Sequence, residues 1–191
     1  MATSVPDERI VEGLRRAVAN YGWRGATLER IAREAGVSRM TLHRRGLGRE
    51  ELFQHLAASY EEDFKASLWP AVTRRGTGLE RLRAALLSVC EVTERYLDFL
   101  AGLDDETDTR LFHEEEGEVR SRDAYIAPVE RLLVDGIADG SIRDVPIDET
   151  AVVLVNAVDR TYRHLRSAHR WGPERASELM LELVCAGLEP R

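Results

Sequence analysis

The chain has 191 residues, 43% of them hydrophobic, which is enough to bury a core in one large or two small domains. No apolar run approaches the ~18 residues that span a bilayer, and the N-terminus lacks the basic and apolar segments of a secretion signal. Cys90 and Cys185 have no Cys-x-x-Cys spacing and are expected to be reduced, which favours a cytoplasmic protein without membrane contact.

The net charge of −7 argues against nucleic-acid binding only if the chain is taken as a whole. Residues 1–56 carry 10 arginines and 7 acidic residues, for a formal charge of +3, whereas the rest of the chain carries 17 basic and 27 acidic residues. A basic head on an acidic body attracts phosphates at one end and repels them elsewhere. The charge distribution therefore permits nucleic-acid binding by the N-terminal part.

The first predicted helix covers residues 8–21, where Ile10, Leu14 and Val18 recur at helical spacing. A proline and an aspartate before it form a start signal, and a turn bounded by two glycines ends it. Trp23 lies in this turn and is expected to pack within the head, because aromatic side chains contribute mainly by buried area.

Residues 27–45 predict two short helices joined by a tight turn, a helix-turn-helix. Leu28, Ile31 and Ala35 share one buried face of the first helix, and Gly36 tolerates the positive φ that a sharp reversal needs. A helical hairpin of some other domain, with solvated arginines, is the alternative. The glycine turn and the basic second helix occur at the right offsets, and they favour a DNA-reading motif.

The second helix of the motif turns basic and polar side chains outward. Ser38 is a good N-cap and Leu42 points inward, so that the opposite side, including Arg45, faces outward. The major groove admits one α-helix, where such side chains reach base edges and phosphates. The residues expected to contact DNA are Thr27, Ser38, Arg39, Met40, Thr41, His43, Arg44 and Arg49, of which Thr27, Ser38 and Arg49 are expected to hold the backbone.

Residues of about 8–56 resemble the N-terminal domain of the TetR (tetracycline-repressor) family of bacterial transcription regulators. The resemblance is carried by the run Thr27-Leu28-x-x-Ile31-Ala32-x-x-Ala35-Gly36-Val37-Ser38-x-x-Thr41-Leu42, followed by Arg49-Glu50-Glu51-Leu52. It implies an all-α protein with a three-helix helix-turn-helix domain at residues 1–48 and a helical effector-binding and dimerisation domain at 49–191. It also implies a homodimer that binds a palindromic operator in double-stranded DNA, usually as a repressor, and that a small-molecule effector releases.

Two positions depart from the family pattern. His43 stands where the family usually has a tyrosine, and Arg45-Gly46 stands where it usually has an aromatic pair. Gly46 is expected to end the helix through a left-handed cap, and Leu47 is left to fill the place of the aromatic anchor. The departures give weight to an alternative function, a helical dimeric interaction protein whose helix-turn-helix no longer reads DNA.

Two long helices are predicted next, at residues 49–70 and 79–101, with a loop at 74–78 between them. Each carries a regular apolar stripe, which is more typical of a core than of a ligand site. The effector is expected to be an apolar or aromatic small molecule, because helix-lined cavities are mostly apolar. The residues expected to line its pocket are Cys90, Tyr96, Phe99, Phe112 and Tyr125.

Residues 104–118 carry eight acidic side chains against one arginine, which indicates a solvated surface. His113 lies there beside Glu114 and Glu116, but one histidine with neighbouring carboxylates is not a closed ligand set, so no metal site is predicted. A further helix is expected at 119–138, with a kink at Pro128.

The last two predicted helices cover residues 149–168 and 173–187. The first of them is apolar over more than one face and therefore needs cover on two sides. A two-fold interface in which each helix pair meets its symmetry mate as a four-helix bundle supplies that cover, and burial within a monomer is the alternative. The resemblance favours the homodimer. The expected interface residues are Val152, Val155, Tyr162, Leu179 and Leu183.

An enzyme is the competing class of protein. The sequence contains no Gly-x-Ser-x-Gly, no phosphate-binding loop and no paired-histidine zinc spacing. The five histidines are scattered, and His164 and His169, which are five residues apart, are expected on different faces of a helix. Neither catalysis nor a cofactor is predicted.

Overall fold

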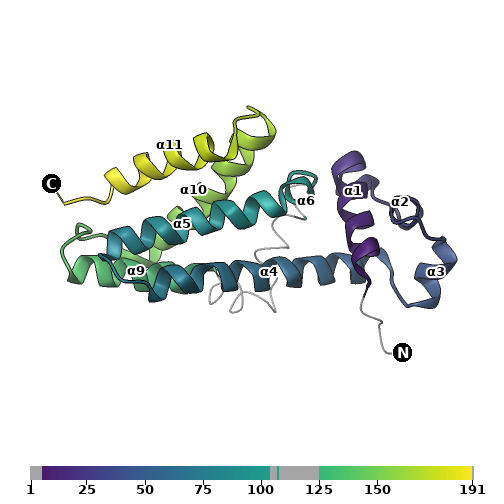
Figure 1. The fold of residues 1–191 in the computed structure, drawn as a ribbon, viewed down its shortest axis with the longest axis horizontal. Helices are drawn as coiled ribbons and strands as arrows, with labels where there is room; N and C mark the ends of the chain where they lie inside the picture. The colour runs from purple at the N-terminus through teal and green to yellow at the C-terminus, as the bar shows by residue number, and fades with distance from the viewer. Residues whose placement is uncertain (1–5, 104–106, 108–124, 191) are drawn as a thin grey trace. The chain divides into compact units, whose positions relative to one another are not determined.

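The computed structural model describes residues 6–103, 107 and 125–190, and these residues form helices with no strand among them (Figure 1). The prediction of an all-α protein is confirmed. The chain divides into two compact units, one within Met1–Tyr60 and Tyr96–Glu114, the other within Glu61–Arg95 and Glu115–Arg191. The expected functional division at residue 49 stays a prediction. None of the helices in the described ranges is long and apolar enough to cross a membrane.

The first unit contains α1 (Glu8–Gly25, kinked at Gly22), α2 (Leu28–Glu34), α3 (Arg39–Arg44), α6 (Leu97–Ala101) and the start of α4 (Arg49–Thr73). In each of the first three helices a side chain just before the helix accepts a backbone N–H of the first turn, which would otherwise be unpaired. These N-caps are Asp7, Thr27 and Ser38.

Aromatic rings form the centre of the first unit. The ring of Phe53 lies 4.8 Å from that of Trp23 and 5.9 Å from that of Phe99, measured between centroids. All three side chains are buried, which confirms that Trp23 packs within the head. The backbone N–H of Trp23 also donates a hydrogen bond of 2.8 Å to the carbonyl oxygen of Gly102, so the segment after α5 completes this core.

The prediction of one helix over residues 79–101 is wrong. Helix α5 (Gly78–Arg95) ends before Tyr96, whose φ of −109° and ψ of 9° lie outside the helical range, and α6 follows as a separate helix. The separate helix is held by the contact of Phe99 with Phe53 and by the hydrogen bond from Trp23 to Gly102. These partners are more than 40 residues away in the chain, so the local periodicity carries no sign of the break.

The second unit contains the rest of α4 together with α5, α9 (Ala127–Ala138), α10 (Ile147–Ser167) and α11 (Pro173–Ala186). Helix α5 packs against α9, α10 and α11, and α10 packs against α9 and α11 (Figure 1). The kink expected at Pro128 stays a prediction, because most of the chain before this residue in the predicted helix lies outside the described residues. Pro128 lies in the first turn of α9, where the N–H that proline lacks would have had no intrahelical acceptor. Residues 119–124 of the predicted helix at 119–138 lie outside the described residues.

Candidate functional site

Helix α3 turns a row of side chains toward solvent. Leu42 is fully buried and anchors the helix, whereas Met40 is 63% exposed and Arg39, His43 and Arg44 are also exposed. Within the part of the chain that the structure describes, neither Arg39 nor Arg44 has an ion-pair partner. Their charges are therefore available to an anionic partner.

Two of the three hydroxyl residues predicted to contact DNA, Thr27 and Ser38, cap helices. Ser38 Oγ accepts a hydrogen bond of 3.1 Å from the Thr41 backbone N–H and lies 2.9 Å from Thr41 Oγ1. Thr27 Oγ1 accepts one of 3.3 Å from the Arg30 backbone N–H. These bonds fix the starts of α2 and α3 and thereby orient the exposed side of α3, and a contact of the same hydroxyls with a DNA backbone stays a prediction.

Arg49 stacks on an aromatic ring at the start of α4. Its guanidinium carbon lies 4.3 Å from the centroid of the Trp23 ring, a distance typical of a cation–π interaction. The stacking holds the side chain, which is half-buried, in one position. A guanidinium held in this way keeps free donors for a phosphate, and the predicted backbone contact of Arg49 stays a prediction.

The end of α3 differs from the sequence prediction at Arg45. Its Nη1 lies 2.8 Å from Asp7 Oδ2, so this side chain is paired with the N-cap of α1 and is not freely outward. Gly46 ends the helix at φ 67° and Leu47 is 1% exposed, which confirms the left-handed cap and the burial of Leu47. Hydrogen bonding to Arg45 lowers the pKa of Asp7 below its ordinary value. The sequence shows Asp7 as a helix start, but not its partner 38 residues away.

Replacing Arg45 by glutamine is expected to speed amide hydrogen exchange in α3 by about two- to fivefold, a modest effect because both partners of the ion pair are more than a third exposed. Exchange in α1 is expected to stay unchanged, because Asp7 Oδ1 still accepts from the Ile10 N–H. Asp7→Ala removes the cap as well and should speed exchange in both helices. Unchanged exchange in α3 of Arg45→Gln would show that the ion pair does not hold the helix.

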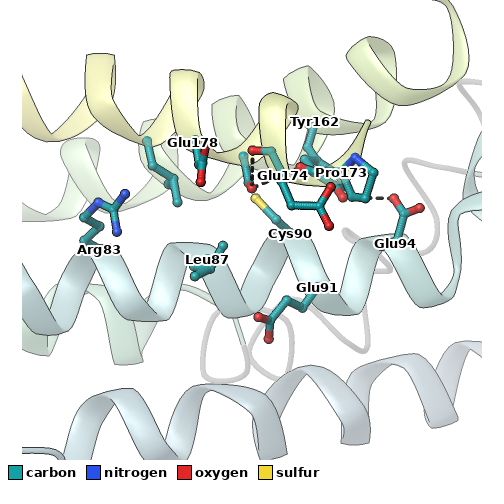
Figure 2. Close-up of a pocket in the computed structure, with 11 residues that line it drawn as sticks. Arg83, Leu87, Cys90, Glu91, Glu94, Tyr162, Pro173, Glu174 and Glu178 are labelled. Atoms are coloured by element: carbon teal, nitrogen blue, oxygen red, sulfur yellow. Dashed lines mark hydrogen bonds between the residues drawn. The ribbon is translucent and has the colours of Figure 1, made fainter. Parts of the chain in front are cut away.

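A pocket of about 440 Å³ lies in the second unit between α5, α10 and α11 (Figure 2). Of the residues predicted to bind an effector, Cys90 is the one that lines it. Burial raises the pKa of the Cys90 thiol to about 12, so this side chain is uncharged at neutral pH. The residues that line the pocket are Arg83, Leu87, Cys90, Glu91, Glu94, Tyr162, Pro173, Glu174, Ser177, Glu178 and Leu181.

Glu94 on α5 accepts hydrogen bonds from two side chains of α10 beside this pocket. Its Oε2 accepts hydrogen bonds from the Tyr162 hydroxyl at 2.9 Å and from Arg166 Nε at 2.7 Å. Arg166 also donates to the carbonyl oxygen of Trp171, in the turn between α10 and α11. The Arg166 hydrogen bond, followed by that of Tyr162, holds the pKa of Glu94 below its ordinary value, so Glu94 is ionised at neutral pH.

The structure does not bring the other predicted effector residues to this pocket. Tyr96 and Phe99 belong to the core of the first unit. Tyr125 is buried in the second unit, where its ring packs edge-on against Phe64 with 4.5 Å between centroids. Phe112 lies outside the described residues. The carboxylates of the pocket were missed, because the sequence gives no sign that glutamates on α5 and α11 line the same pocket.

The predicted interface residues fall into two groups. Val152, Leu179 and Leu183 are exposed, as is their neighbour Val153, at 62%. Val155 and Tyr162 are buried within the second unit of a single chain, because the α10 face that carries them packs on neighbouring helices. On the adjacent helices α10 and α11, the exposed large apolar side chains are therefore two pairs, Val152 with Val153 and Leu179 with Leu183.

The expectation that His164 and His169 lie on different helix faces is wrong. Helix α10 ends at Ser167, so helical spacing no longer applies, and the two rings lie 5.0 Å apart in an edge-on contact. Among the described residues, no three histidine, cysteine or acidic side chains are grouped to hold a metal ion. His113 and its acidic neighbours lie outside the described residues.

Two family models match the chain. "Bacterial regulatory proteins, tetR family" covers residues 10–56, and "Tetracyclin repressor-like, C-terminal domain" covers residues 75–188, which is more than half of the sequence. The first match includes the helix-turn-helix and the exposed side of α3, and the second includes the pocket and the exposed surface of α10 and α11. No curated protein matches the chain.

Several solved structures share the fold over nearly their whole length. The ketosteroid transcriptional regulator KstR2 of Mycobacterium tuberculosis is 20% identical with a TM-score of 0.76, covering 100% of this chain and 99% of its own. The regulator PfmR of Thermus thermophilus is 18% identical with a TM-score of 0.73, and the match covers 98% of this chain and 100% of PfmR. FadR of Bacillus subtilis, solved in complex with stearoyl-CoA, is 16% identical with a TM-score of 0.68. The match covers 95% of this chain and 98% of FadR. Identities this low show a common fold.

Proposed function

Because the chain belongs to the TetR family of transcriptional regulators, we propose that it is a cytoplasmic repressor that binds a palindromic operator as a homodimer and is released by a small-molecule effector. One observation carries the proposal. Arg39, His43 and Arg44 project from α3 into solvent, and neither arginine has an ion-pair partner among the described residues. A helix anchored by Leu42 on one side and basic on the other fits the major groove.

Two copies of this helix related by a two-fold axis read two half-sites. In the simplest geometry the half-sites lie one helical turn apart, ~34–36 Å. A surface that meets its own copy across the axis must be self-complementary, and the exposed apolar residues of α10 and α11 supply such a surface. We propose that these two helices form the dimer interface.

The proposed role is regulatory, not catalytic. An effector changes the operator affinity only as far as it binds the DNA-competent and DNA-incompetent states with different affinities. The Bacillus subtilis relative was solved with stearoyl-CoA, which has a long apolar chain. An effector with an apolar part is proposed for this protein too, since pockets between helices are largely apolar.

A mobility-shift assay with the DNA that flanks the gene tests the proposal. A shift that competitor DNA does not abolish supports an operator-binding regulator. If no shift occurs with that DNA, and selection from a random DNA library enriches no sequence, the alternative of a dimeric interaction protein without DNA binding replaces it.

Replacing Arg44 by alanine is expected to weaken operator binding. The negative slope of the logarithm of the binding constant against the logarithm of the salt concentration should become less steep by about 0.9 for each phosphate that Arg44 neutralises. Arg39→Ala is expected to cost about 1–3 kcal/mol and to relax specificity at one base pair per half-site, if its guanidinium reads a guanine. Fluorescence anisotropy over a salt series measures both. Arg74→Ala removes an arginine of the second unit that is also exposed, and it should change neither quantity. An unchanged salt slope in Arg44→Ala, together with unchanged affinity and specificity in Arg39→Ala, would contradict the proposed role of this helix.

A further inference from the structure

We propose that the pocket between α5, α10 and α11 binds an amphipathic organic cation, and, resting on the proposed function, that this cation is the effector. The pocket volume, about 440 Å³, is in the range of small-molecule sites, roughly 300–1,000 Å³. Two properties of its lining, an uncharged floor and an acidic rim, define the chemistry of the ligand.

The floor of the pocket is apolar and uncharged. Leu87 and Cys90 contribute side chains from α5, and Tyr162 contributes its side chain from α10 (Figure 2). Leu181 on α11 also lines the pocket and is fully buried. The Cys90 residue is 1% exposed. Burial keeps this thiol protonated, so it adds no charge to the floor. A hydrocarbon chain or ring fits such a surface, because it removes apolar area from water.

The rim of the pocket is acidic. Glu91 on α5 and Glu174 and Glu178 on α11 are exposed, and none of them forms an ion pair with a described residue. Glu94 also lines the pocket but is neutralised by Arg166. Arg83 is the one basic side chain among the lining residues, which leaves a formal charge of −2. Carboxylates above an apolar floor attract a cation and repel a carboxylate or a phosphate of the same size.

A cation in this pocket also acts on the contacts around it. It competes with Arg166 for Glu94, because both interact with the same carboxylate. Arg166 in turn holds the carbonyl oxygen of Trp171 in the turn between α10 and α11, the helices that carry the proposed dimer interface. Ligand binding is thereby coupled to the arrangement of these two helices, which gives it a route to the operator affinity.

The test compares three probes that share an eight-carbon chain: n-octyltrimethylammonium, n-octanol and n-octyl sulfate, each below its micelle concentration. Isothermal titration of the full-length protein should show the cation binding at least about tenfold more tightly than the alcohol, and no binding of the sulfate at the same site. Glu174→Gln with Glu178→Gln should weaken cation binding by about three- to tenfold, the range expected for two partly exposed charge pairs.

A matched double variant serves as the control. Asp148→Asn with Glu149→Gln removes two exposed carboxylates at the start of α10, which do not line the pocket, and cation binding should stay within about twofold of the original. All four carboxylates are exposed, so both variants are expected to fold. Equal binding of the three probes, or equal loss in both double variants, would overturn the assignment of a cation pocket.

The role of the cation as effector is measured separately, through operator affinity with and without octyltrimethylammonium. A change in affinity in the original protein that disappears in the pocket variant supports the role. Binding of the cation with no change in operator affinity overturns it. If the protein binds no operator in the absence of any probe, the proposed function fails, while the titration still decides whether the pocket takes cations.

Discussion

Replacing both Val153 and Leu183 by glutamate is expected to turn the protein into a monomer and to weaken operator binding by roughly 100- to 10,000-fold. Two heads held in one dimer bind two half-sites with an avidity that exceeds the affinity of one head by about 10²–10⁴. A monomer loses this factor without any change in α3. Light scattering coupled to size-exclusion chromatography measures the mass, and fluorescence anisotropy measures the operator affinity.

The expected loss follows from the exposure of the two side chains. Val153 is 62% and Leu183 is 70% exposed on neighbouring helices, so both can be covered by a second chain. A glutamate in a covered apolar surface has its charge desolvated without a partner, and the symmetry of the interface places it there twice. Neither substitution disturbs the core of a single chain, since both sites face solvent.

Val134→Glu is the matched control, because Val134 is an exposed valine of the same unit that lies on α9. It should leave both the mass and the operator affinity unchanged. A double variant that remains dimeric would place the interface on another surface. A monomeric variant with undiminished affinity would show that one head alone recognises the DNA, which contradicts binding to a palindrome.

The helix-turn-helix was predictable because its signals are local. The cap at Ser38 acts on an amide three residues away, and the positive φ of Gly36 and Gly46 is a property of glycine at those positions. The inward position of Leu42 follows from helical periodicity within one turn. The exposed side of α3 could therefore be derived residue by residue. The pairing of Arg45 with Asp7 could not, because its partner lies in another helix.

The pocket was largely unpredictable from sequence. Cys90 was expected to line a ligand site although its apolar stripe is more typical of a core. Glu174 and Glu178 are exposed glutamates of α11 that the sequence analysis did not assign to a site. Whether such residues border a pocket depends on how α11 packs against α5, a contact between segments about 90 residues apart. Periodicity within one helix identifies its buried face, but not which neighbouring helix covers it.

Replacing Phe99 by alanine is expected to destabilise the first unit by about 3–5 kcal/mol, the usual cost of removing a buried phenylalanine ring. Phe99 is fully buried and its ring packs on Phe53, which in turn packs on Trp23. This ring was expected from sequence to line an effector pocket, whereas the structure places it in the core of the unit that carries α3. Phe99→Leu, which keeps most of the apolar volume, should cost less than half as much.

The fluorescence of Trp23 measures the loss of stability in Phe99→Ala, because its ring lies 4.8 Å from that of Phe53. In a background with Trp69→Phe and Trp171→Phe it is the only tryptophan, and its fluorescence during urea unfolding reports on the first unit alone. A shift of the Trp23 transition to lower urea, with effector affinity of the folded protein unchanged, is the expected result. If Phe99→Ala left the Trp23 transition unshifted but altered the effector affinity, Phe99 would line an effector pocket, as the sequence analysis expected. The packing of Phe99 on Phe53 would then not be what separates α6 from α5.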